Sequence, residues 1–302
     1  MTGLSFKYKR ILVPLDGSKL AERALVPAMV IAESMAAEVH CLQIVTGSAL
    51  TIDPSLNQRV VRARTQAANI YLQSLPSRFS ETKVRIEVAT DVGPAAKSIT
   101  DYAKRNDVDL IVMSSHGRSG HKRWVYGNVA IKILRRAPCD TLMVRPLTDV
   151  KLFSKNRVLV PLDGSRRAER ALRPALALAT AWDMDVLLLY VILPVNVELE
   201  PSSIRYMFDD IEAEARADAK IYLQGLKATL IPVHRSVSVA TVTGTPAAAI
   251  IDYAVEQQAD LIAMSSHGRT GAELWIMGSV SEKVLRGANC ATLIVRSSQD
   301  KG

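Results

Sequence analysis

Short apolar runs alternate along the chain with longer segments in which apolar residues recur every three or four positions. In the first half the runs lie at 10–15, 39–45, 109–113 and 141–144. Such runs, bounded by turn residues, predict buried parallel strands. The spacing at 129–136 is that of an amphipathic helix. Strands that alternate with helices of this kind predict a parallel sheet with right-handed crossovers.

The remaining elements of the first half follow from the same pattern. Helices are expected at 18–37, at 93–105 and from about 57 to 75, and a less buried strand at 83–89, where charged and apolar residues alternate. Ser18 and Ser165 are expected N-caps, because their hydroxyls can accept from first-turn N–H groups. Pro27 and Pro174 fall inside the first helical pattern of each half, where proline kinks a helix.

The second half of the chain repeats the first. Residues 12–18, Leu-Val-Pro-Leu-Asp-Gly-Ser, return unchanged at 159–165, and from residue 70 onward the offset grows from 147 to 151. A period near 150 residues is a domain duplication and not a solenoid repeat. We therefore expect an α/β protein of two tandem Rossmann-like domains, at 1–146 and 155–297. Each should contain a five-stranded parallel sheet flanked by helices.

Composition narrows the functional classes. The chain has 302 residues, of which 48% are hydrophobic, and no apolar run approaches the roughly 20 residues of a membrane span. The first ten residues lack the apolar core of a signal peptide. Three cysteines make no disulfide framework, so we expect a cytoplasmic location and buried free thiols.

The formal net charge of +8 could indicate nucleic acid. The basic residues are scattered through the predicted helices, however, and aromatic residues, which stack on bases, are only 5%. We therefore expect neither a nucleic-acid partner nor a membrane partner.

The motif with the clearest chemistry is a loop after the fourth strand of each half. Met113-Ser114-Ser115-His116-Gly117-Arg118 is followed after nine residues by Gly127-Asn128, and residues 264–269 repeat it before Gly278-Ser279. Such a loop runs from the carboxyl end of a strand to the N-terminus of a helix. Unpaired N–H groups and the positive end of the helix dipole favour an anion there, and phosphate is the obvious candidate.

Other phosphate and catalytic motifs are missing from the sequence. It contains neither the P-loop pattern nor a Gly-x-Gly-x-x-Gly after the first strand. Ser115 and Ser266 lack the context of a nucleophile elbow. His116 and His267 are candidates for acid–base chemistry. Since no carboxylate partner stands at a fixed spacing, a loop-shaping or phosphate-facing role is favoured for them.

The early Pro-Leu-Asp-Gly-Ser, the late glycine loop and the terminal helix and strand together resemble a tandem universal stress protein. The resemblance covers both halves, and the branch of the family that the chain resembles is the one that binds ATP. It implies a nucleotide site in each domain, filled by ATP with or without Mg²⁺. The positions implied are Pro14, Asp16, Ile44, Met113, Gly117, Gly127, Asn128, Val129 and Ala130 in the first domain, and Pro161, Asp163, Val191, Met264, Gly268, Gly278, Ser279, Val280 and Ser281 in the second.

The sequence departs from the family pattern at three places. Ser114 and Ser265 replace the first glycine of the loop, and Asn128 replaces the closing Ser or Thr that Ser279 retains. The first loop is more basic, through His121, Lys122 and Arg123. Because it retains Ser279, the second site is expected to match the family pattern more closely than the first.

The sequence predicts a nucleotide-binding regulator of the stress response. Slow ATP hydrolysis is an alternative, but no positioned base stands out, so no catalytic residue is assigned and no metal ligand is predicted. The other alternative is an interaction module with vestigial pockets, in which Asp16 and Asp163 only cap helices. We expect the domains to form an intramolecular pseudo-dimer through their last strands, with further homodimerisation as an extension.

Overall fold

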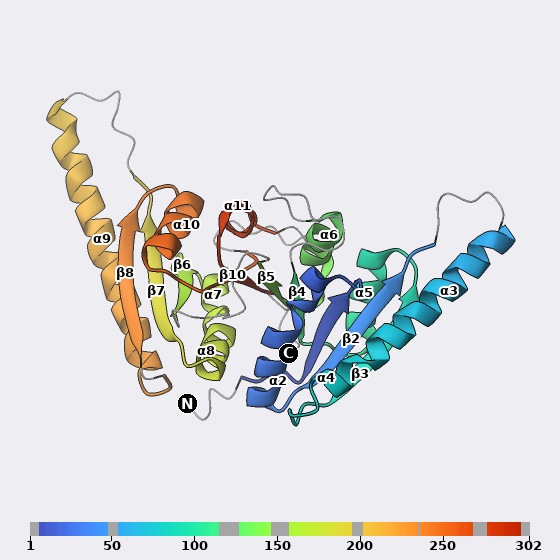
Figure 1. The fold of residues 1–302 in the computed structure, drawn as a ribbon. Coiled ribbons are helices and arrows are strands. Elements are labelled where there is room, and N and C mark those ends of the chain that lie inside the picture. The colour runs from blue at the N-terminus through green and yellow to red at the C-terminus, as the bar shows by residue number, and fades with distance from the viewer. Residues whose placement is uncertain are drawn as a thin grey trace. The chain divides into compact units, whose positions relative to one another are not determined.

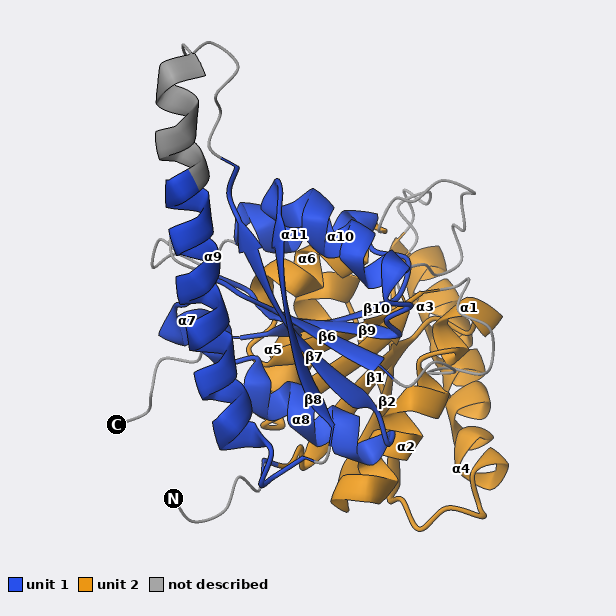
Figure 2. Ribbon diagram, turned by 90° about the vertical axis from the view of Figure 1, so that its left-hand side faces the viewer, with its two compact units in different colours: residues 1–6, 153–299 blue, residues 7–152, 300–302 orange. Residues whose placement is uncertain are grey.

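The protein is described from a computed structural model, which places residues 6–47, 54–114, 127–145, 157–194, 202–234, 236–267 and 277–296 (Figure 1). Residues 7–152 and 153–299 form two compact units (Figure 2). We call them the first domain, drawn in orange, and the second domain, drawn in blue. Each is described by itself.

The first domain alternates strands and helices as the hydrophobic pattern predicts. Its elements are β1 (Arg10–Leu15), α1 (Lys19–Glu22), α2 (Leu25–Met35), β2 (Glu38–Val45), α3 (Pro54–Gln73), α4 (Leu75–Arg78), β3 (Ile86–Val92), α5 (Ala95–Arg105), β4 (Leu110–Ser114), α6 (Asn128–Arg136) and β5 (Asp140–Val144).

The second domain repeats this order with a longer third helix. Its elements are β6 (Arg157–Leu162), α7 (Arg166–Glu169), α8 (Leu172–Ala181), β7 (Asp185–Ile192), α9 (Ser202–Leu230), β8 (Val237–Thr243), α10 (Pro246–Glu256), β9 (Leu261–Ser265), α11 (Ser279–Gly287) and β10 (Ala291–Val295).

Each domain contains one five-stranded parallel sheet. The strand order is β3-β2-β1-β4-β5 in the first domain and β8-β7-β6-β9-β10 in the second. In both, helices pack along the sheet; α2 contacts β1 and β2, and α3 contacts β2 and β3. The predicted fold class, two tandem Rossmann-like α/β domains, is confirmed.

The strands are apolar because both faces of the sheet are covered. Ile11, Leu12 and Val13 of β1 are completely buried, as are Leu110 and Ile111 of β4. Burial of such side chains contributes about 1.5–3 kcal/mol each. The edge strand β3, by contrast, has no fully buried residue, which explains its alternating sequence.

The order of strands reverses between the first strand of each domain and its fourth. β1 pairs with β2 over six residues but with β4 only at Ile11 and Leu12, and β6 pairs with β9 only at Val158 and Leu159. The carboxyl halves of these strands therefore diverge. Ligands of parallel sheets bind at this switch point, outside the carboxyl ends of the strands.

Two sequence predictions need correction. The helix expected at 18–37 is two helices, because Pro27 has no N–H for the carbonyl of residue 23 and its ring crowds that turn; Arg23 and Ala24 instead donate to the third residue back. The strand expected at 83–89 lies instead at Ile86–Val92. Its position is fixed by pairing with β2, which begins where Val39 faces Ile86. The sequence pattern of a partly exposed edge strand does not mark the ends of the strand clearly.

Two smaller predictions are confirmed. The Ser18 and Ser165 hydroxyls cap the first helices by accepting from the N–H groups of Ala21 and Ala168, each at 3.1 Å. Cys41, Cys139 and Cys290 are buried thiols that form no disulfide bond, and burial raises the pKa of Cys41 to about 12. Among the residues described, no helix is both long enough and apolar enough to cross a membrane.

The cap generates a test of the fold. Replacing Ser18 by Ala should lower the free energy of unfolding of the first domain by about 1 kcal/mol, because an N–H of the first turn loses its acceptor. Ser34→Ala is the matched control, since this exposed hydroxyl donates only to a carbonyl in its own helix. Scanning calorimetry measures both variants; equal midpoints would contradict a stabilising cap.

Candidate functional site

A cavity of about 760 Å³ opens at the carboxyl edge of the second domain's sheet. Strands β6, β7 and β9, helices α9 and α10, and the N-terminus of α11 all contribute to its wall. The structure brings together here every position predicted for the second domain except Gly268, which lies outside the described residues: Pro161, Asp163, Val191, Met264, Gly278, Ser279, Val280 and Ser281. Their contact with a ligand stays a prediction.

The turn after β6 holds the Asp163 carboxylate in place. Gly164 has a φ of +82°, a conformation that side chains other than glycine disfavour. Asp163 Oδ1 then accepts from the Ser165 backbone N–H at 3.0 Å and from its hydroxyl at 2.6 Å. Ser165 rather than Asp163 caps the helix, so Asp163 shapes the turn and also lines the cavity.

Gly278 closes the loop at the other side of the cavity. Its N–H donates to the Ser266 carbonyl at 2.8 Å, and it is the N-cap of α11. Its φ of −60° is open to any residue, so the close approach of the backbone, and not the conformation, favours glycine here. An added Cβ would lie 3.3 Å from Ser266 O, tighter than ordinary contact.

The first turn of α11 is tied to the end of β9. The Ser281 hydroxyl donates to the Ser265 carbonyl at 2.9 Å, and both residues are buried. The matching residues of the first domain are Ala130 and Ser114, and Ala130 has no hydroxyl to donate. This connection therefore distinguishes the second loop from the first.

Sequence reasoning missed the part of the wall that α9 contributes and one residue of β7. Ala215, Asp218 and Tyr222 of α9 line the cavity, together with Tyr190 of β7. The two tyrosine rings meet edge to face with centroids 6.2 Å apart. Tyr222 donates to Glu169 at 2.9 Å, and burial first, then this bond, raises the pKa of Tyr222.

A signal for part of this wall was present in the sequence. Ile-Tyr-Leu-Gln occurs at both 70–73 and 221–224, so the tyrosine is duplicated with the domain. The other α9 residues carry no motif. They reach the cavity only because the helix packs against β7 and β8.

The first domain places its predicted residues at the same elements. Pro14 and Met113 lie near the carboxyl ends of β1 and β4, and Asp16 accepts from the Ser18 N–H at 3.0 Å. Gly127, Asn128, Val129 and Ala130 form the N-cap and first turn of α6. Gly117 lies outside the described residues.

Another cavity, of about 540 Å³, lies in the first domain, and among the described residues that line it Ile44 is the one predicted position. Arg64 lines it and donates to the Thr46 carbonyl at 3.0 Å. The matching position of the second domain is Ala215. A long cationic side chain therefore stands at a position where the second domain keeps open space.

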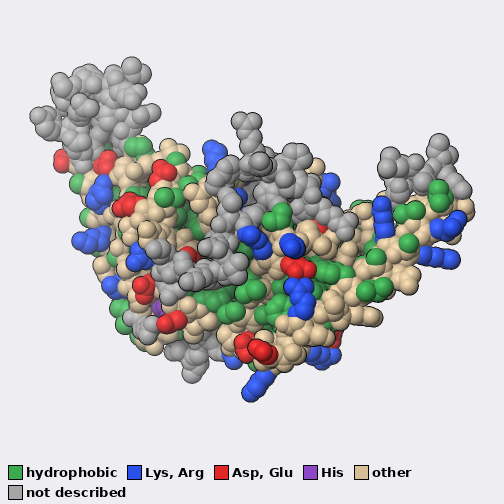
Figure 3. Space-filling view, in the orientation of Figure 1, with side chains coloured by type: hydrophobic (Ala, Val, Ile, Leu, Met, Phe, Trp, Pro, Cys, Tyr) green, Lys and Arg blue, Asp and Glu red, His purple; other side chains and the backbone are tan. Residues whose placement is uncertain are grey.

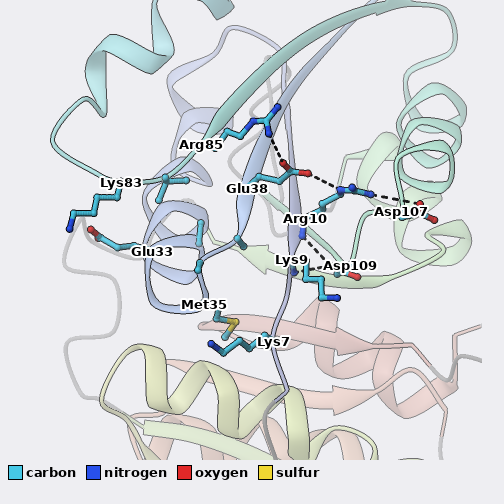
Figure 4. Close-up of a pocket in the computed structure, with 14 residues that line it drawn as sticks. Lys7, Lys9, Arg10, Glu33, Met35, Glu38, Lys83, Arg85, Asp107 and Asp109 are labelled. Atoms are coloured by element: carbon cyan, nitrogen blue, oxygen red, sulfur yellow. Dashed lines mark hydrogen bonds and ion pairs between the residues drawn. The ribbon is translucent and has the colours of Figure 1, made fainter.

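A third cavity, of about 1050 Å³, lies at the amino edge of the first sheet and is lined by charged side chains (Figure 4). Two of its acids are engaged: Glu38 accepts from Arg10 at 2.7 Å, and Asp109 accepts from the backbone of Lys9 and Arg10. Lys9 and Lys83 extend in different directions in Figure 4. The surroundings are those of an ion-pair network that joins strand ends, and we assign no ligand to it.

Charge elsewhere is similarly dispersed. On the face drawn in Figure 3, Lys and Arg side chains are interspersed with acidic ones and form no single basic patch. Within the described residues, no group of three His, Cys, Asp or Glu side chains is arranged to hold a metal ion.

Comparison with known proteins agrees with this architecture. The model of the universal stress protein family matches residues 7–145 and 155–296. The chain belongs to the universal stress protein family. Each domain contains one of the two matches.

Curated relatives match one domain's length of this chain. Universal stress protein MJ0531 of Methanocaldococcus jannaschii is 30% identical over 143 residues, which are 46% of this chain and 82% of the relative. Universal stress protein YxiE of Bacillus subtilis is 30% identical over 152 residues, or 99% of its length.

Several solved structures are similar over both domains. A universal stress protein from Archaeoglobus fulgidus has a TM-score of 0.69 at 19% identity, covering 97% of this chain and 100% of the other. At this identity the likeness concerns the fold alone.

The Ser281–Ser265 bond generates a second test. Ser281→Ala should lower the free energy of unfolding of the second domain by about 1–2 kcal/mol, because a buried carbonyl loses its donor. Ser279→Ala, two residues earlier and exposed, should change it by less than about 0.5 kcal/mol. Calorimetry of the two variants compares them directly; equal effects would show that the buried bond adds nothing.

Proposed function

We propose that this protein is an ATP-binding regulator in the cellular stress response, with its principal nucleotide site in the second-domain cavity. The observation that carries the proposal is the convergence of separate segments. The turn after β6, the ends of β7 and β9, and the first turn of α11 were each implied by the family resemblance, and all line one cavity.

The shape and lining of the cavity suit an adenine nucleotide. Small-molecule sites typically have volumes of about 300–1,000 Å³, with apolar walls and few polar groups, and 760 Å³ falls within this range. Val191, Leu193, Ile250 and Met264 offer apolar surface for a base. The Asp163 carboxylate can accept from ribose hydroxyls.

The opposite side of the cavity suits phosphate. The first N–H groups of a helix have no intrahelical acceptor, and those of α11 begin at Ser279 on the cavity wall. The described lining includes Asp163 and Asp218 but neither Lys nor Arg. Since carboxylate and hydroxyl oxygens suit Mg²⁺, we propose that the ligand is MgATP rather than free ATP.

The two domains are proposed to differ in affinity. Ser279 offers a hydroxyl to phosphate or Mg²⁺, whereas Asn128 offers an amide, and Arg64 stands where the second domain has Ala215. A second, weaker site in the first domain follows from the retained Asp16 and glycine N-cap.

Two other functions are kept as alternatives. A slow ATPase would need a base that positions water, and no carboxylate is hydrogen-bonded to His267 among the described residues. An interaction module would leave the cavity without nucleotide. In either case we propose a cytoplasmic setting, in which ATP is abundant.

Asp163→Ala tests nucleotide binding. The substitution should weaken the binding free energy of ATP by about 1–3 kcal/mol, because the lost carboxylate is a charged hydrogen-bond partner. Asp252→Ala removes an exposed carboxylate of α10 that is not on the cavity wall, and should bind as the parent does. Titration calorimetry with MgATP measures both. A parent protein that binds no ATP would favour the interaction module.

We also propose that the two domains form an intramolecular pseudo-dimer through β5 and β10. In each domain's strand order these strands are terminal, and both are apolar. Exposed apolar edges are an aggregation hazard and are usually paired or covered.

Separate expression of the two halves tests the pseudo-dimer. Each half should form dimers or insoluble material, because its edge strand lacks a partner. Sedimentation of the purified halves, with the full chain as control, gives the result. Stable monomeric halves would contradict the proposal.

A further inference from the structure

Ser266 and His267 follow β9, and the hydrogen bonding of the His267 ring has no role so far in the proposed nucleotide site. His267 Nδ1 lies 3.0 Å from Ser266 Oγ, and the His267 backbone N–H points to Ser265 Oγ at 3.4 Å. The side chain lines the cavity, and its Nε2 atom is buried without a hydrogen-bond partner among the described residues. A buried imidazole nitrogen left in this state is costly.

The hydrogen bond to Ser266 assigns the tautomer. Ser266 is only 2% exposed, so its hydroxyl hydrogen needs an acceptor within the protein. The single side-chain bond of this hydroxyl within the described residues is to His267 Nδ1. The hydroxyl therefore donates to Nδ1, and the neutral ring carries its own hydrogen on Nε2. Nε2 is thus a buried donor in a residue of the cavity wall.

The surroundings of this donor specify the chemistry of its acceptor. Among the described lining residues there is no Lys or Arg, and the N-terminus of the nine-residue helix α11 contributes N–H groups to the same wall. An anionic oxygen is the strongest acceptor for both an imidazole N–H and the N–H groups of a helix N-terminus. In a nucleotide, the phosphates carry such oxygens.

We propose that His267 Nε2 donates a hydrogen bond to a phosphate oxygen of the bound nucleotide and that Ser266 is the positioning residue that fixes the required tautomer. This inference rests on the proposed function and assigns a binding role, with no proton transfer. The adenosine part of the ligand lies against other walls, so the contact distinguishes ATP from adenosine.

Substitutions that mimic one ring nitrogen each test the contact. The amide nitrogen of Gln can approach the position of Nε2, whereas that of Asn reaches only about as far as Nδ1. His267→Ala and His267→Asn should lower the affinity for MgATP by about tenfold or more. The affinity of His267→Gln should stay within about threefold of that of the parent. All three should bind adenosine as the parent does, which is the matched control.

Ser266→Ala and magnetic resonance extend the test to the tautomer. The variant should weaken MgATP several-fold and leave adenosine unchanged, because the ring is then free to carry its hydrogen on either nitrogen. Long-range ¹H–¹⁵N correlation spectra of the unmutated full-length protein should show the Nε2–H form of His267, a result that needs no variant to fold.

The outcomes separate this inference from the proposed function. If the parent protein binds no ATP, the proposed function fails. If the parent binds ATP but the His267 variants bind it equally well, or lose ATP and adenosine in parallel, the function stands and the phosphate contact is wrong. An Nδ1–H ring in the spectra would likewise overturn the role given to Ser266.

Discussion

The reversal of strand order in each sheet is the constraint on which the site depends. Because β6 pairs with β9 only through Val158 and Leu159, the chain segments that follow these two strands leave the sheet on diverging paths. The turn that carries Asp163 and the loop that returns to Gly278 therefore border one crevice. Backbone pairing at the amino halves of the strands is what creates the space at their carboxyl ends.

Local chemistry then determines what that space can hold. The turn after β6 needs a glycine at a φ of +82° and directs two Ser165 donors to the Asp163 carboxylate. The loop after β9 is closed by the Gly278 N–H and by the Ser281 hydroxyl. The cavity thus has one side that bears the Asp163 carboxylate and another that is formed by the N-terminus of α11, and we propose that ribose and phosphate each meet one of these walls.

Duplication kept the framework of the two domains and let their cavities diverge. The caps at Ser18 and Ser165 have the same geometry, with identical 3.1 Å bonds, because any strand-to-helix turn of this kind needs them. Some of the positions that differ between the halves lie at the cavities or their loops, such as Arg64 against Ala215 and Ala130 against Ser281.

The sequence by itself determined the duplication, the α/β class, the order of elements and the residues of the two glycine motifs. These follow from periodicity and short-range turn chemistry, which act between residues close in the chain. The ends of β3 were misplaced, because pairing with β2 sets them, and Pro27 predicted a kink where the structure has a break between two helices. Only the tertiary structure could show that Tyr190, Ala215 and Asp218 join the cavity and that His267 Nε2 is buried beside it. Tyr190, Ala215 and Asp218 carry no local signal, and packing across the sheet decides what they face.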